Sequence, residues 1–474
     1  MHAAHWLLLV PSIGIAAMAL VAAQPATPPP ADVATVFRTL CENCHGATLA
    51  GGQAPSLLDD EGLHGDSDAD LARTIREGAL TTAMPSFKGA LTDQQIRALV
   101  IYIREGRARA SQGTMPAPPT LPARIESERH AFRVELVADD LETPWGLEIM
   151  PDGKLLVTER PGRLRVVDGD RLLPPITGVP AVWEKQDGGL LDVGLHPDFQ
   201  RNGWVYLALS EAGGAAPGDS TTRIVRGRLH DGALVDQVSI FQATPALYWA
   251  SNTHYGARLL FDRQGLLYFS IGDRGRPAES QDLGSPYGKL HRVRDDGSVP
   301  ADNPFVGRTG AVASVWSYGH RNQQGLAIDS QTGALWATEH GPRGGDELNL
   351  VVKGRDYGWP TITYGMNDNG TPITDRTERD GLEQPVVYWT PSLAVGAIAF
   401  YTGDLFPRWK QHLLVTALAG QQLRRLELDA GRVTNQEVLL RGYGRVRDVA
   451  VSADGPIYLA LNNPGRIVRL VPER

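Results

Sequence analysis

The spacing of apolar residues divides the chain into two parts. Before residue 108, apolar positions recur with the period of an amphipathic helix, and from about residue 129 onward they form short runs broken by Gly, Asp and Asn. Helices are predicted for Asp32–Leu40, Ala69–Glu77 and Asp93–Glu105. The pattern therefore indicates a small all-α domain followed by an all-β domain.

A turn followed by an alternating strand recurs through the second part. Four segments carry it: Pro151 to Val157, Asp262 to Tyr268, Ser330 to Trp336 and Ala453 to Tyr458. Related strands stand at Gly203 to Leu209 and Gln411 to Val415. Six such units predict a six-bladed β-propeller. The last unit is similar in sequence to the first. Packing the last blade against the first would close the ring and leave no sheet edge exposed.

Two further segments mark the domain limits. The apolar stretch from Trp6 to Ala23 ends in small residues and predicts a secretory signal peptide over 1–23, with an uncleaved membrane anchor as the alternative. Residues 109–127 are rich in proline and predict a semi-rigid linker. The expected domains are thus 31–108 and 128–474.

Composition limits the partners. The 474 residues are 42% hydrophobic and 21% charged, which suits a globular chain of more than one domain. A net charge of −8 argues against nucleic acid and against an anionic membrane surface. We therefore expect no nucleic-acid partner, and membrane association only if the N-terminal segment is retained.

Both cysteines of the chain lie in Cys41-Glu42-Asn43-Cys44-His45, which is the pattern of covalent c-type haem attachment. The thiols would bond the haem, His45 would ligate the iron, and Met84 is predicted as the sixth ligand. Half of a zinc site is an alternative, but zinc would need further Cys or His ligands nearby. A disulfide and a chance Cys-x-x-Cys are the other alternative interpretations of the motif. Haem attachment implies export, so the predicted location is the periplasm.

Four segments of the β domain carry a resemblance to a known family. They are Thr143 to Leu147; Gln186 to Asp192 with His196 to Phe199; Asn252 to Gly256 with Gly272 to Gly275; and Gly319 to Leu326 with His340 to Pro342, Asp346-Glu347 and Tyr357 to Pro360. In their order and spacing they resemble the soluble aldose dehydrogenases of glucose and sorbosone type, which use pyrroloquinoline quinone. The resemblance spans nearly all of residues 131–474.

The resemblance implies roles for particular residues. His254 is expected to be the catalytic base, and a neutral imidazole suits proton removal from a sugar hydroxyl near neutral pH. Arg321 would stabilise negative charge on the quinone. Gln186, Asn322 and Gln324 are assigned to cofactor binding, although a glutamine before Gly-Gly also suits a turn.

Calcium is implied in the same way. The carbonyl groups of Gly341 and Pro342 match those that hold an ion against the quinone, and Glu347 and Tyr357 match a second, structural calcium site. A further acidic ligand of that second site falls near Asn367 here.

The sequence also departs from the family. Tyr401-Thr402-Gly403 lacks the lysine that glucose-type members place on a cofactor carboxylate, and Thr253 stands where they have Asp. Arg445 and Arg447 could bind the cofactor carboxylates instead. The alternative is that both are solvated charges on the surface. The sugar is left open.

Together the two parts predict a quinohaemoprotein. It would oxidise an aldose at its anomeric carbon, and electrons would pass to the fused haem and then to a respiratory acceptor. Two other classes remain: a hydrolytic propeller of lactonase type, and a non-catalytic propeller that binds a partner protein.

Overall fold

The computed structural model describes residues 32–58, 64–79, 84–112 and 120–473. The predicted signal peptide and part of the predicted linker lie outside these ranges. Within them, no helix is long and apolar enough to cross a membrane.

The N-terminal domain is helical, as predicted. Its helices are α1 (Val33–Leu40), α2 (Glu42–His45), α3 (Asp68–Glu77) and α4 (Asp93–Gln112). Asp32 caps α1 by accepting a hydrogen bond from the Thr35 N–H, and Ser67 and Asp70 form a capping box on α3. The helices enclose one apolar core, to which α4 contributes Ile96, Leu99, Val100 and Ile103.

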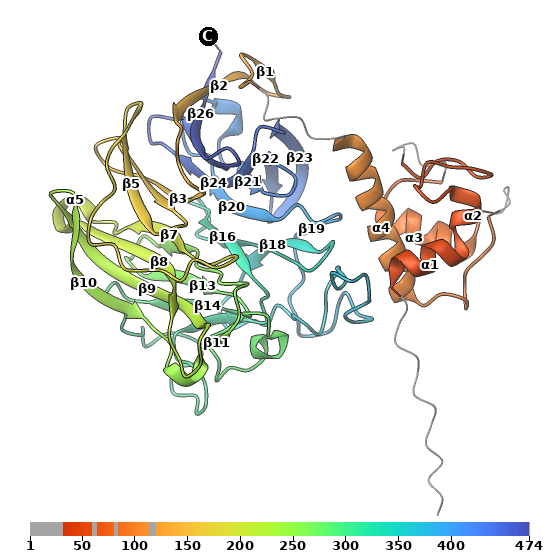
Figure 1. Cartoon of the computed structure of the whole chain (residues 1–474), viewed down its shortest axis with the longest axis horizontal. Coiled ribbons are helices and arrows are strands. Elements are labelled where there is room, and N and C mark those ends of the chain that lie inside the picture. The colour runs from red at the N-terminus through yellow and green to blue at the C-terminus, as the bar shows by residue number, and fades with distance from the viewer. Residues whose placement is uncertain (1–31, 59–63, 80–83, 113–119, 474) are drawn as a thin grey trace, which may run out of the picture.

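The remainder is an all-β propeller of six four-stranded blades (Figure 1), which confirms the predicted architecture. Blade one contains β3 (Pro144–Ile149), β4 (Leu155–Glu159), β5 (Arg163–Asp168) and β6 (Arg171–Leu172). Blade two contains β7 (Leu190–Leu195), β8 (Trp204–Ala212), β9 (Asp219–His230) and β10 (Ala233–Phe241), and the short β11 (Trp249–Ala250) pairs with β9. Blade three contains β12 (Leu259–Phe261), β13 (Leu267–Ile271), β14 (Lys289–Val293) and β15 (Val315–Tyr318).

The next two blades follow the same order. Blade four contains β16 (Gln323–Ile328), β17 (Leu335–Glu339), β18 (Asp346–Val351) and β19 (Val387–Trp389). Blade five contains β20 (Val395–Phe400), β21 (Leu413–Ala417), β22 (Gln422–Asp429) and β23 (Arg432–Arg441). Four one-turn helices lie in the connections: α5 (Phe199–Asn202), η1 (Pro245–Leu247), η2 (Pro277–Ser280) and η3 (Pro407–Trp409).

The sixth blade closes the ring with strands from both ends of the domain. It contains β24 (Arg445–Val451), β25 (Ile457–Asn462) and β26 (Arg466–Pro472), and its outer strand is β2 (Ala131–Ala138) from the start of the domain. The pairing of β2 with β26 removes the free edge that each strand would otherwise present.

The predicted linker of 109–127 is too long at both ends. Helix α4 continues past residue 108 to Gln112. Before that point, buried Arg107 attaches the helix to the domain through a hydrogen bond to the Leu57 carbonyl (2.7 Å) and an ion pair with Asp66. At the other end, β1 (Ile125–Glu126) pairs with β2 and belongs to the propeller.

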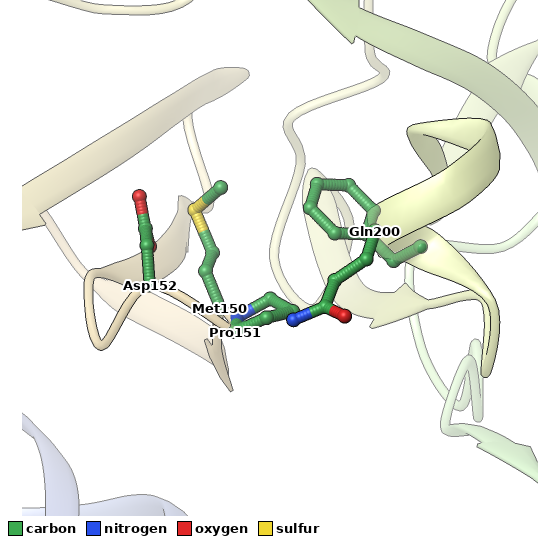
Figure 2. Close-up of a pocket in the computed structure, with 5 residues that line it drawn as sticks. Met150, Pro151, Asp152 and Gln200 are labelled. Atoms are coloured by element: carbon green, nitrogen blue, oxygen red, sulfur yellow. The ribbon is translucent and has the colours of Figure 1, made fainter.

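The strand order places particular loops on one face of the propeller. The six inner strands, β3, β7, β12, β16, β20 and β24, start on the same face because each blade repeats one antiparallel order. The loops that enter them, and the loops between second and third strands, therefore gather on that face. The β3–β4 turn and α5 lie on the opposite face, where Met150, Pro151, Asp152, Phe199 and Gln200 line a cavity of about 240 Å³ (Figure 2).

Candidate functional site

The loop before β12 and the loop after β13 bring His254 and Asp273 together. His254 Nδ1 lies 2.6 Å from Asp273 Oδ1, and the other carboxylate oxygen accepts a hydrogen bond from Trp359 Nε1 at 2.8 Å. The Asp273 side chain is 1% exposed, whereas that of His254 is 18% exposed. The imidazole thus stands at the surface of the site with a buried carboxylate behind it.

The charge of Asp273 decides which imidazole nitrogen carries the proton. Burial raises the pKa of Asp273, but the hydrogen bond from His254 and the nearby charge of Arg321 outweigh it, and the net pKa is lowered. An ionised carboxylate only accepts hydrogen bonds, so Nδ1 must donate and Nε2 keeps its lone pair. His254 is therefore held in the tautomer that a proton acceptor requires.

The backbone around His254 is fixed from two sides. Its φ is +53°, and its N–H donates to Asp187 Oδ2 at 3.3 Å. Asn322 Oδ1 accepts hydrogen bonds from the Gly256 N–H at 3.0 Å and from Gln324 Nε2 at 3.2 Å. Asn322 and Gln324, both buried, thus hold the loop that presents His254.

Gln186 lies beside the same loop. It is exposed, with a φ of +52°, in the segment that enters β7. The next residue, Asp187, donates its N–H to the Asn252 carbonyl at 3.0 Å and accepts from His254. Gln186 is thus next in sequence to a residue that bonds the His254 loop, and its role in the site stays a prediction.

Arg321 is anchored by the loop between β17 and β18. Its Nη1 donates to the carbonyls of His340 (3.0 Å) and Gly341 (2.8 Å), and its backbone N–H donates to Glu339. The guanidinium carbon lies 5.5 Å from the centre of the Trp359 ring, and burial lowers the pKa of Arg321. Arg321 thus lies next to the His254–Asp273 pair, since Trp359 contacts both.

Further basic side chains gather at the start of β24 and directly after β17. Arg447 donates from Nη1 to Gln324 Oε1 at 2.9 Å, and burial together with Arg258 and Arg445 lowers its pKa to about 9. Burial, Arg447 and Arg321 lower the pKa of His340. Within the described residues, Arg447 Nε and His340 Nε2 are buried without a hydrogen-bond partner.

This chemistry fits an anionic, carboxylate-bearing quinone. Unpaired N–H donors and crowded positive charge are costly unless an anion satisfies them. Arg447, with Arg445 beside it, is a cation that could compensate for the lysine absent from Tyr401-Thr402-Gly403.

The residues predicted for calcium fall in two places. The carbonyl of Gly341 accepts from Arg321, and that of Pro342 accepts from the Gly345 N–H at 3.1 Å, so each keeps one lone pair for an ion. No cluster of three or more His, Cys, Asp and Glu side chains suited to a metal occurs in the described ranges. A calcium ion next to Gly341 would thus rely on backbone and cofactor oxygens.

The second place lies between β17 and β18. Glu347 is directly opposite Glu339 in the strand register, and burial and Glu339 raise the pKa of Glu347 to about 8. Asn349 Oδ1 is buried there without a hydrogen-bond partner among the described residues. Two facing carboxylates and an unsatisfied amide oxygen fit a hard cation. The Tyr357 hydroxyl donates to the Leu350 carbonyl and accepts from the Val352 N–H, so one lone pair of the hydroxyl remains.

The helical domain positions the predicted haem ligands. His45 Nδ1 lies 3.2 Å from the Pro55 carbonyl, which fixes the ring and leaves Nε2 for iron. Cys41 and Met84 are partly buried against the apolar core, while Cys44 is exposed. Burial raises the pKa of the Cys41 thiol to about 11. The residues present therefore fit a haem held by Cys41, Cys44, His45 and Met84.

Sequence reasoning did not single out Asp273, Trp359 or His340 as individual site residues. All three lie within the segments that carry the family resemblance. Asp273 follows the buried strand β13, and a carboxylate directly after a buried strand is a signal that could have identified it.

A propeller with this site and a fused helical haem-binding domain defines a class of sugar-oxidising quinoproteins. Residues 141–469 match the family model described as Glucose / Sorbosone dehydrogenase. Residues 28–103 match the model described as Cytochrome C oxidase, cbb3-type, subunit III. The chain belongs to the glucose/sorbosone dehydrogenase family, with a cytochrome domain at its N-terminus.

Individual relatives agree with this assignment. The chain is 40% identical over 347 residues to Aldose sugar dehydrogenase YliI of Escherichia coli, covering 72% of this chain and 92% of that protein. The apo structure of the soluble aldose sugar dehydrogenase of Escherichia coli superposes with a TM-score of 0.68 at 39% identity, covering 72% of this chain and 100% of that one. The quinone-bound aldose sugar dehydrogenase of Streptomyces coelicolor gives 0.59 at 30% identity, with coverages of 75% and 100%.

Proposed function

We propose that this protein is a periplasmic quinohaemoprotein that oxidises aldose sugars at the anomeric carbon, using pyrroloquinoline quinone and calcium and passing electrons through haem c to a respiratory acceptor. The observation that carries the proposal is the His254–Asp273 pair, beside which lie Arg321 and the buried nitrogens Arg447 Nε and His340 Nε2, which have no hydrogen-bond partner among the described residues. The Streptomyces coelicolor relative, whose structure contains the quinone, supports the choice of cofactor.

The protein's own residues would perform the proton chemistry. His254 Nε2 would accept the proton of the anomeric hydroxyl, while Asp273 would stabilise the imidazolium that forms. Removing that proton allows the hydride to leave the same carbon, so the sugar becomes a lactone. Arg321 would stabilise the negative charge that develops on the acceptor, and Gln186 would help to position the sugar.

The cofactors would supply what side chains cannot. Bound pyrroloquinoline quinone would accept two electrons as a hydride, and haem c would carry them away one at a time. Arg445, Arg447 and His340 would hold the quinone carboxylates, and the Gly341 and Pro342 carbonyls would hold calcium beside it. Calcium at Glu347 would be structural. An N-terminal signal over 1–23 would direct the chain to the periplasm, where haem c is attached.

The test uses the haem as a built-in reporter. Haem absorbance of the purified, haem-loaded chain is recorded with an aldose panel, with and without quinone and Ca²⁺. We expect reduction only when quinone and an aldose are both present, and no sugar oxidation by His254→Ala despite an unchanged haem spectrum. Haem that stays oxidised with every aldose, with lactone hydrolysis instead, would favour the hydrolytic propeller.

A further inference from the structure

The linker is not the only connection between the two domains. Glu105 of α4 forms a two-point ion pair with Arg343 of the propeller, with Nε to Oε1 at 2.7 Å and Nη2 to Oε2 at 2.5 Å. The two side chains are 15% and 25% exposed. A bidentate arginine–carboxylate pair of this kind fixes orientation as well as proximity.

Backbone contacts extend this interface along α4 and α1. Arg97 donates to the carbonyls of Thr363 and Asp375, each at 3.2 Å, and the Val33 N–H donates to the Gly370 carbonyl at 3.2 Å. In Figure 1, α4 lies between the propeller and the other helices.

The interface has an apolar centre. Met366 of the propeller is 1% exposed and belongs to the apolar cluster of the cytochrome domain. Glycine allows the close approach, because a Cβ on Gly344 would lie 2.8 Å from a methyl group of Ile101. Cys41 and Met84 pack against the same cluster. Apolar packing therefore runs without a break from the propeller to the haem ligands.

The propeller segments of this interface also border the candidate active site. Arg343 follows Gly341 and Pro342 in the β17–β18 loop, and Gly341 accepts a hydrogen bond from Arg321. Met366 lies in the 352–386 segment, which also contains Trp359. Met366 forms an isolated antiparallel β-bridge with Arg343. The same two segments thus contact the active site at one end and the cytochrome domain at the other.

We infer that the cytochrome domain is docked on these two segments in one arrangement, fixed by the Glu105–Arg343 pair, and that electrons leave the sugar site across this interface. The linker then tethers the domain but does not set its position. The electron path rests on the proposed function, whereas the docking does not.

Charge reversal tests the docking in the full haem-loaded chain. Glu105→Arg and Arg343→Glu are compared with the double swap and with Arg469→Glu, which breaks a surface pair with Glu135 remote from the interface. We measure the radius of gyration by small-angle X-ray scattering and the rate of haem reduction after aldose is added. We expect each single reversal to expand the molecule and to slow haem reduction about tenfold or more, and the double swap to restore both to within about twofold.

The outcomes separate docking from catalysis. Arg469→Glu should change neither quantity, and dye-coupled sugar oxidation by Glu105→Arg should equal wild type. Single reversals that leave both the radius and the haem reduction rate unchanged would overturn the inference. If the wild type shows no dye-coupled oxidation, the proposed function fails, yet the scattering comparison still decides the docking.

Discussion

Asp273 is the residue that turns His254 from a surface histidine into an oriented base. Replacing it with Asn keeps the shape, but the amide can donate to Nδ1 and so stabilise the wrong tautomer. We expect Asp273→Asn to lower kcat by about 10² to 10⁴ fold, the range typical of lost general-base catalysis. Quinone-loaded protein is assayed with a dye acceptor.

Asp296→Asn serves as the matched control, because this turn carboxylate is bonded locally, to the N–H and the side chain of Ser298. Its kcat should equal wild type. If Asp273→Asn also keeps full kcat, the assignment of the orienting role to Asp273 is wrong.

Met84 provides a second prediction at this scale, because a thioether opposite histidine raises the potential of haem iron. Met84→Ala should lower the reduction potential and leave covalent attachment intact. A spectroscopic redox titration measures this, with Met150→Ala, which lies in the propeller cavity, as control. An unchanged potential in Met84→Ala would identify a different sixth ligand.

The motifs directed attention to His254 and Arg321, which the structure places close together, and their catalytic roles stay predictions. The sequence did not predict which residues of the site form hydrogen bonds with one another. Asp273 and Trp359 are 86 positions apart and meet only because two loops lie on one propeller face. Asn322 is a second example. The motif assigned it to cofactor binding, but its hydrogen bond to Gly256 in the His254 loop depends on long-range packing.

At the scale of elements, all six predicted units fall on the second strand of a blade, namely β4, β8, β13, β17, β21 and β25. These strands are almost fully buried and most follow a tight turn, so their signal is strong in the sequence. The outer strands are more exposed and have a weaker pattern. The predicted linker limits differ from the structure because α4 runs on to Gln112 and because β1 pairs with β2, a pairing that forms only in the folded propeller.

Arg258 joins three inner strands at the centre of the propeller. It donates to Asp192 and Asp448, each at 3.0 Å, and all three side chains are buried. Arg258→Met would leave two carboxylates unpaired, which costs about 3 to 5 kcal/mol of the free energy of unfolding. Denaturant unfolding measures this, with exposed Arg263→Met as control. A loss below about 1 kcal/mol would show that the carboxylates find other partners or protons.

Glu148, on β3, gives a prediction for pH. Burial, with Asp192 and Asp448, raises its pKa from the ordinary 4.5 to about 8. Between these values the folded protein binds more protons than the unfolded chain, so this group makes stability fall as pH rises from about 4.5 to about 8. Glu148→Gln should match wild type at pH 5 and be more stable at pH 8, measured by denaturant unfolding. Parallel stability curves for the two proteins would contradict the shift.

For the whole molecule, the order of the two domains was readable from composition and periodicity, but their contact was not. The interface joins α4 to residues 343–375, which lie more than two hundred positions further along the chain. It contains the Glu105–Arg343 ion pair, the hydrogen bonds of Arg97, buried Met366 and the close approach of Gly344 to Ile101. None of these has a distinctive local pattern. Interdomain geometry in this chain is therefore a property of the folded molecule.

The length of the linker distinguishes a docked cytochrome domain from a swinging one. Residues 113–124 separate α4 from β1, and we would insert thirty Gly/Ser residues beside Thr120. For a swinging domain, effective concentration falls as the inverse three-halves power of linker length, so haem reduction by aldose would slow roughly sixfold. For a docked domain the rate should change by less than about twofold, because the interface and not the tether sets the distance. The same insertion in the Glu105→Arg background should produce the full decrease, since that variant depends on the tether alone.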